Sequence, residues 1–193
     1  LEPYKNLEKL IKDKNYFIIS TNADGQLEKS DFDKNKIFSM QGNYGYLQCM
    51  TPCTDEIYES EEYIKKMTKS IENNRVSMDT VPRCPHCGNY LIPNLRCDDT
   101  FVEKPHMKNS EKYRDFLREN INKNILFLEL GVGYNTPVII RYPFEKMTYN
   151  LDKSTLVRVN KGMATVSKEI EDKSISLDED INKVLLDVIK NMN

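Results

Sequence analysis

The chain has 193 residues, which suits one medium-sized domain, with or without a small insert, and allows a sizeable buried core. With 39% hydrophobic and 30% charged residues the composition is globular, and a net charge of −2 excludes bulk electrostatic binding to DNA or to an anionic membrane. The apolar run over 125–128 is far too short to span a bilayer and no signal peptide opens the sequence, so we expect a cytoplasmic protein with neither nucleic acid nor membrane as partner. Leu1 is not an initiator Met, which indicates a chain that begins part-way into a longer protein, a tag scar or processing.

Helical and strand patterns alternate along the chain. In order, we expect a helix over 3–13, strands over 16–20 and 36–40, helices over 55–74 and 109–122, a strand over 124–130, a helix over 138–149, strands over 154–159 and 174–177, and a helix over 179–192. Strands that alternate with helices are typical of a doubly wound parallel sheet, in which ligands bind beyond the carboxyl ends of the strands.

Polar loops follow four of the expected strands, over 21–26, 41–45, 131–137 and 160–162. Their Gly, Asn, Asp, Thr and Gln residues offer backbone N–H groups and amides to ribose, phosphate and carboxamide groups, although loops are polar in any case. The G-x-G at Gly131 and Gly133 lacks the third glycine of a dinucleotide fingerprint, and no G-x-x-x-x-G-K-[ST] occurs, which argues against a P-loop NTPase.

Four of the five cysteines form two close pairs. An odd count without a secretion signal argues against a disulfide scaffold. The C-x3-C and C-x2-C spacings place two thiolates on each of two turns, which together complete a tetrahedral zinc site whose ligands are Cys49, Cys53, Cys84 and Cys87. Four protein ligands leave no open position, so the zinc would be structural. Iron in the same sulfur cage, or four unrelated reduced thiols, are the alternatives.

Two further residues bear on this region. His86 lies inside the second pair and is either a solvated bystander or a replacement ligand, and the first interpretation is favoured. We expect Cys97 to be a small core residue. The interval between the pairs is longer than in a plain zinc ribbon and has helical spacing, so we expect a ribbon with an inserted helix.

The order of these pieces resembles a sirtuin. The loop Thr21-Asn22-Ala23-Asp24-Gly25 is similar to the sirtuin Q-N-I-D-G loop, and the four-cysteine ribbon follows it as in that family. Sirtuins have G-T-S where this chain has Gly131-Val132-Gly133, and they have I-N where it has Val159-Asn160. The similarity is greatest to the class M, or macrodomain-linked, sirtuins. It includes blocks over 21–24, 41–45, 93–103, 127–144 and 147–148, and so covers nearly the whole chain.

The resemblance implies an α/β fold with a partial Rossmann-like parallel sheet and an inserted four-cysteine zinc-ribbon module. The Rossmann-like NAD-binding domain would comprise residues 1–48 and 98–193, and the zinc module residues 49–97. It also implies a protein ADP-ribosyltransferase that uses NAD as substrate and acts on a protein, with a lipoylated carrier protein as one candidate acceptor and a macrodomain protein as a further partner.

The resemblance also assigns roles to individual residues. Ordinary sirtuin deacylases have a His general base where this chain has Gln41, and an amide cannot take a proton at neutral pH. The implied catalytic residues are Asn22 and Gln41, and the implied cofactor-binding residues are Thr21, Asn22, Asp24, Gly131, Gly133, Asn135 and Asn160. A turn that hydrogen-bonds its own backbone is the alternative for Asn22 and Asp24, and a solvated strand end for Gln41.

One departure from sirtuins concerns the cofactor. Nothing in the chain matches the family's opening strand and G-A-G-x-S loop, which cradles the pyrophosphate. We therefore expect the 193-residue chain alone to bind NAD weakly or not at all, as a fragment, a split gene product or a degenerate copy. A micromolar affinity measured by calorimetry would contradict this expectation.

The remaining functional hypotheses are a sirtuin-type deacylase and a non-enzymatic zinc-ribbon module that binds proteins. Asp98, Asp99 and Glu103 either shape the groove or form a solvated acidic loop.

Overall fold

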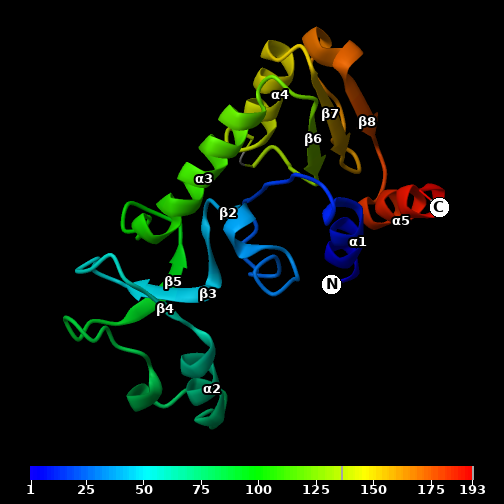
Figure 1. The fold of residues 1–193 in the computed structure, drawn as a ribbon. Coiled ribbons are helices and arrows are strands. Elements are labelled where there is room, and N and C mark those ends of the chain that lie inside the picture. The colour runs from blue at the N-terminus through cyan, green and yellow to red at the C-terminus, as the bar shows by residue number, and fades with distance from the viewer. Residues whose placement is uncertain (136, 193) are drawn as a thin grey trace. The chain divides into compact units, whose positions relative to one another are not determined.

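The computed structural model describes residues 1–135 and 137–192. The chain divides into two compact units: one comprises Leu1–Phe17, Ser30–Asp33 and Tyr113–Asn193, and the other Ile18–Lys29 and Lys34–Lys112. Figure 1 shows the elements of each unit.

The first unit is built on a parallel sheet of three strands in the order β6-β7-β8. These are β6 (Ile125–Leu130), β7 (Ser154–Val159) and β8 (Ser174–Leu177), and α4 (Arg141–Asn150) forms the crossover between β6 and β7 (Figure 1). Leu156 on the central strand is fully buried, and the rings of Phe127 and Phe144 lie 5.0 Å apart between sheet and helix. The 3-10 helix η3 (Lys168–Lys173) leads into β8.

Two helices from the two ends of the chain pack against each other in this unit, α1 (Glu2–Ile11) and α5 (Ile181–Asn191). Buried Asn6 donates from Nδ2 to Asn182 Oδ1 at 2.8 Å. The carboxylate of Asp180 accepts from Lys183 N at 3.0 Å and so caps the first turn of α5. The long helix α3 (Lys104–Asn120) contributes its last two turns to the first unit.

The second unit contains a parallel pair and an antiparallel sheet. The pair is β1 (Ile18–Ser20) with β2 (Ile37–Ser39), which follows the 3-10 helix η1 (Lys34–Lys36). The sheet has the order β4-β3-β5, with β3 (Gly42–Cys49), β4 (Ile57–Glu59) and β5 (Leu91–Leu95); α2 (Glu61–Lys69) and the 3-10 helix η2 (Met78–Thr80) lie between β4 and β5 in the chain.

The structure confirms a mixed α/β fold with parallel strands, and the bounds of β7 and β8 are those that the sequence predicts. Two of the expected elements were wrong. The loop expected over 41–45 is mostly the start of β3, because Gly42 and Asn43 pair with residues of β5. The helix expected over 55–74 is the strand β4 followed by the shorter α2, because Ile57–Glu59 pairs with β3. The domain boundaries at 48 and 97 stay a prediction.

Within the described ranges, every helix falls short of the length and apolar character needed to cross a bilayer.

Candidate functional site

The four paired cysteines converge on one point in the second unit. Their sulfur atoms all lie within 4.8 Å of one another. The Cys49–Cys87, Cys49–Cys53 and Cys53–Cys84 sulfur pairs are 3.5, 3.7 and 3.6 Å apart. Zn–S bonds of about 2.3 Å in a tetrahedron require sulfurs about 3.8 Å apart, so the donor set fits a tetrahedral ion. The four cysteines could therefore hold a metal ion.

The surroundings of Cys84 favour the thiolate that such an ion needs. Burial disfavours ionisation, but the backbone N–H groups of Cys87 and His86, together with the neighbouring thiols, lower the pKa of Cys84 to about 6. A hydrogen bond with Cys87, burial and the other two thiols raise the pKa of Cys53 to about 12.

The structure favours the four-cysteine ligand set over one that contains His86. The His86 Nε2 atom lies 2.9 Å from Glu56 Oε2, and this partner raises the pKa of the imidazole. The expectation for Cys97 was wrong: it is exposed, in the polar loop that follows β5.

Asn22 and Gln41 lie at the same edge of the second unit. Each stands two residues beyond the end of its strand, and β1 and β2 are parallel with Ser20 paired to Ser39. Backbone hydrogen bonds continue past the strand ends, from Met40 N to the Ser20 carbonyl at 3.0 Å and from Tyr44 N to the Ala23 carbonyl at 2.9 Å. The segments that carry the two amides therefore run side by side.

A partly buried polar network stabilises this edge. The Glu28 carboxylate accepts from Ser39 Oγ at 2.5 Å and from Asn43 Nδ2 at 2.9 Å, and Asn43 Oδ1 accepts from Gly45 N at 2.8 Å. Gly42 has φ 68°, and a Cβ there would lie 2.1 Å from the Asn94 carbonyl oxygen, so the residue after Gln41 must be glycine.

Arg96 places a cation beside Gln41. Its backbone N–H donates to the Gln41 carbonyl at 3.0 Å and its Nε to the Met40 carbonyl at 3.4 Å. The guanidinium lies over the Phe101 ring at 4.6 Å and pairs with Glu103. Sequence reasoning missed Arg96 and Glu28, because only the fold brings them to the ends of β1 and β2.

Two predicted residues in the loop after β1 make local hydrogen bonds. Asp24 is exposed, and its carboxylate accepts from Gln26 N at 3.1 Å in a turn. The Asn22 backbone N–H donates to Ser20 Oγ at 3.0 Å. The Asp24 contact is of the kind that the alternative of a self-bonded turn describes. Thr21 is half-buried in the same loop.

The other predicted residues lie at the carboxyl edge of the parallel sheet in the first unit. Gly131 and Gly133 follow β6, and Asn160 follows β7, with Gly131 N donating to the Val159 carbonyl at 2.9 Å. Asn160 Nδ2 donates to the Val132 carbonyl at 2.9 Å and so joins the two loops. Asn135 is exposed at the end of the glycine loop.

Buried charges that the sequence reasoning missed stand beneath these loops. Arg158 donates from Nε and Nη2 to the two carboxylate oxygens of Glu129 at 2.7 and 2.8 Å, and both side chains are fully buried. Arg158 Nη1 also binds Glu145 at 2.7 Å, and Arg141 Nη1 lies 3.5 Å from Glu129. Their sequence signal was a charge inside an apolar strand, as in the runs 128–130 and 157–159.

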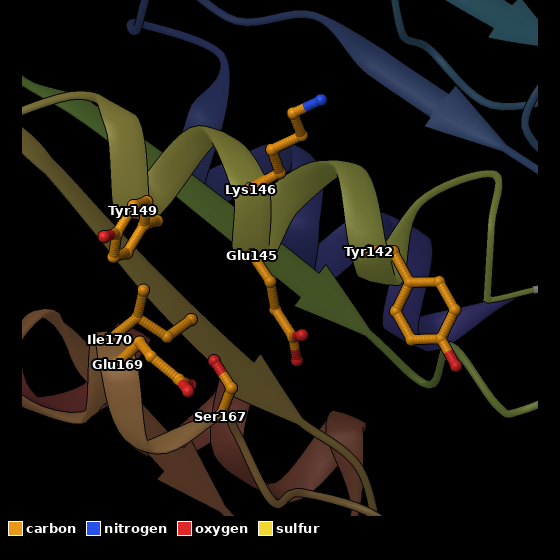
Figure 2. Close-up of a pocket in the computed structure, with 7 residues that line it drawn as sticks. All are labelled: Tyr142, Glu145, Lys146, Tyr149, Ser167, Glu169 and Ile170. Carbon is orange, nitrogen blue, oxygen red and sulfur yellow. The ribbon is translucent and has the colours of Figure 1, made fainter.

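A shallow hollow of about 330 Å³ lies along α4. Glu145 points into it from the helix, across from Ser167 and Glu169, whereas Lys146 points the opposite way (Figure 2). None of the predicted site residues lines this hollow. Its lining therefore shares no residue with the candidate site at the strand ends.

Comparisons with known proteins give two relatives. The chain is 29% identical over 192 residues, 98% of its length, to a protein of Staphylococcus aureus (strain Mu50 / ATCC 700699) named "Protein ADP-ribosyltransferase". It is 32% identical over 170 residues, 83% of its length, to a protein of Fusarium oxysporum f. sp. cubense named "Probable bifunctional ADP-ribose hydrolase/ADP-ribosyltransferase". The chain spans 61% of the first relative and 28% of the second. No protein-family model matches it.

Proposed function

We propose that this chain is part of an NAD-dependent protein ADP-ribosyltransferase of the class M sirtuin type, and that Asn22 and Gln41 are its catalytic residues. The similarity to a named protein ADP-ribosyltransferase along 98% of the chain carries the proposal. The convergence of the two amide-bearing segments at the ends of adjacent parallel strands supports the choice of residues.

The side chains at this edge suit positioning more than proton transfer. As substrate, NAD supplies an activated ribose: its bond to nicotinamide breaks, the acceptor atom bonds to the same carbon, and the acceptor loses a proton. Amides of Asn22 and Gln41 donate and accept hydrogen bonds but take no proton at neutral pH. They would orient the ribose and stabilise an oxocarbenium-like transition state, whereas deacylation needs a general base at position 41.

The metal site would act through β3. This strand runs from Gly42, next to Gln41, to Cys49 in the cysteine cluster. An ion held by four thiolates has no open position for substrate or water. We therefore propose a structural zinc that fixes one end of the strand whose other end carries the candidate amide.

The acceptor and the further partner are also part of the proposal. Following the resemblance to class M sirtuins, we propose a protein acceptor, with a lipoylated carrier protein as the first to test. The name of the Fusarium relative joins an ADP-ribose hydrolase to a transferase, which supports a macrodomain protein as functional partner.

The test incubates the whole natural protein that contains this chain with a lipoylated carrier protein and with NAD labelled in its ADP-ribose part. We expect label that stays on the carrier, loss of transfer in Gln41→Ala, and unchanged transfer in Asn122→Ala, an exposed amide in the turn after α3. Acyl-ADP-ribose in solution without labelled protein would favour the deacylase instead. No turnover of NAD at all would favour a non-enzymatic module.

A further inference from the structure

We propose that Arg141 and Asn160 are positioning residues that aim the backbone N–H of Gly133 outward, as a donor for the diphosphate of NAD. This inference rests on the proposed function and adds a mechanism for its phosphate side.

Arg141 connects the loops at the carboxyl edge of the parallel sheet by hydrogen bonds. It is 1% exposed, so it does not itself meet a ligand in solution. Its guanidinium donates to three carbonyl oxygens and one hydroxyl: Val132 at 3.2 Å, Met163 at 3.1 Å, Thr165 at 2.8 Å and the Tyr134 hydroxyl at 3.0 Å. These acceptors belong to the loop after β6 and the loop after β7, so one side chain fixes both.

The Val132 carbonyl oxygen accepts hydrogen bonds from two side chains, Arg141 and Asn160. Arg141 Nη1 approaches it at 3.2 Å and Asn160 Nδ2 at 2.9 Å. The structure has no cis peptide bonds in the part that it describes, and in a planar trans peptide the C=O and the following N–H point in opposite directions. Because both donors hold the carbonyl inward, the Gly133 N–H points away from them.

The space beside Gly133 is open. Apart from the two residues next to Gly133 in the chain, an added Cβ there would meet no heavy atom of the described residues within 4 Å. A glycine without neighbours at this point lets a bulky anion approach the backbone closely. Backbone N–H groups beyond the strand ends of a parallel sheet are common phosphate donors.

Nearby carboxylates balance the positive charge of Arg141. Arg141 and Arg158 face the carboxylates of Glu129 and Glu145, so the four-residue cluster is neutral. Arg141 therefore works through the direction of its hydrogen bonds more than through an excess positive charge at the surface. The same contacts give Asn160 a positioning role beside the direct cofactor contact that the resemblance implies.

The experiment measures, by calorimetry, the binding of NAD, ADP and adenosine to the whole natural protein that contains this chain. Arg141→Lys keeps the charge but replaces a planar fork by one ammonium, which cannot reach acceptors in both loops. We expect NAD and ADP to bind roughly tenfold to a hundredfold more weakly, as for a lost hydrogen bond to a charged group, and adenosine to bind as before. Asn160→Ala should show the same pattern. Lys146→Met on the exposed side of α4 is the matched control and should change nothing.

Equal weakening of all three ligands, or no change, would overturn the inference while the proposed function stands. If Asn160→Ala weakens adenosine binding as much as NAD binding, Asn160 contacts the ribose directly and the inference is wrong. Should Arg141→Lys fail to fold in a thermal melt, half-buried Asn160→Ala decides alone. If the whole natural protein that contains this chain binds no NAD, the result counts against the proposed function itself.

Discussion

Replacement of Cys84 by Ser should unfold the module around the cysteine cluster. The core of this module consists of Leu47, Cys49, Cys84 and Leu91, with Tyr58 and Tyr63 packed against it. Burial of a leucine contributes roughly 1.5–3 kcal/mol, so the two leucines supply roughly 3–6 kcal/mol. A structural zinc bound by thiolates contributes roughly 10–16 kcal/mol, so the bound ion would stabilise this module more than its apolar core does.

Metal content and hydrogen exchange measure this directly. We expect one zinc per chain by mass spectrometry and four sulfur ligands at about 2.3 Å by X-ray absorption. Cys84→Ser should lose most of the zinc and the slow amide exchange over β3 and β5. Exposed Cys97→Ser, outside the cluster, is the control and should keep both. Because protons compete with the metal for thiolates, affinity should fall as the pH is lowered.

Slow exchange over β3 and β5 that survives in Cys84→Ser would refute a fold that depends on the metal. A native protein that contains no metal, and whose exchange a chelator leaves unchanged, would refute it equally.

Three further predictions concern stability. Arg158→Met leaves the buried Glu129 carboxylate without its bidentate partner and should destabilise the protein by about 3–5 kcal/mol in urea unfolding. A Glu129→Leu/Arg158→Met double variant should recover most of this loss. A much smaller loss in the single variant would contradict the importance of this buried ion pair. Gly42→Ala should destabilise far more than Gly162→Ala, since both have positive φ but only at Gly42 does a Cβ meet backbone, at 2.1 Å; equal losses would contradict the clash. Burial, and then the Arg96 cation, lower the pKa of His106 in the folded protein. The free energy of unfolding should therefore fall as the pH drops below the pKa of an unfolded histidine, about 6.5. His106→Asn should flatten this pH dependence, and identical slopes in the two proteins would refute the role of His106.

Local patterns in the sequence predicted the elements whose partners lie nearby. The strands over 154–159 and 174–177 were predicted to the residue, because β-branched runs alternate there with clear turn signals. The start of β3 at Gly42 was missed, because its pairing with Leu95 is set by residues about 50 positions away.

The candidate site divides in the same way. The four cysteines were found from spacing alone, and they converge in the structure. Arg141 and Glu28 were not found, since their importance comes from carbonyls and side chains that only the folded loops bring to them. Such positioning residues carry little local signal, apart from a charge where an apolar residue is expected.

The most direct test of the proposed catalytic edge is a structure of the native protein bound to a non-hydrolysable NAD analogue. We expect the nicotinamide ribose within hydrogen-bond distance of the Asn22 and Gln41 amides, at the edge formed by the ends of β1 and β2. An analogue bound elsewhere, with those two amides turned to opposite sides of the molecule, would contradict the proposal.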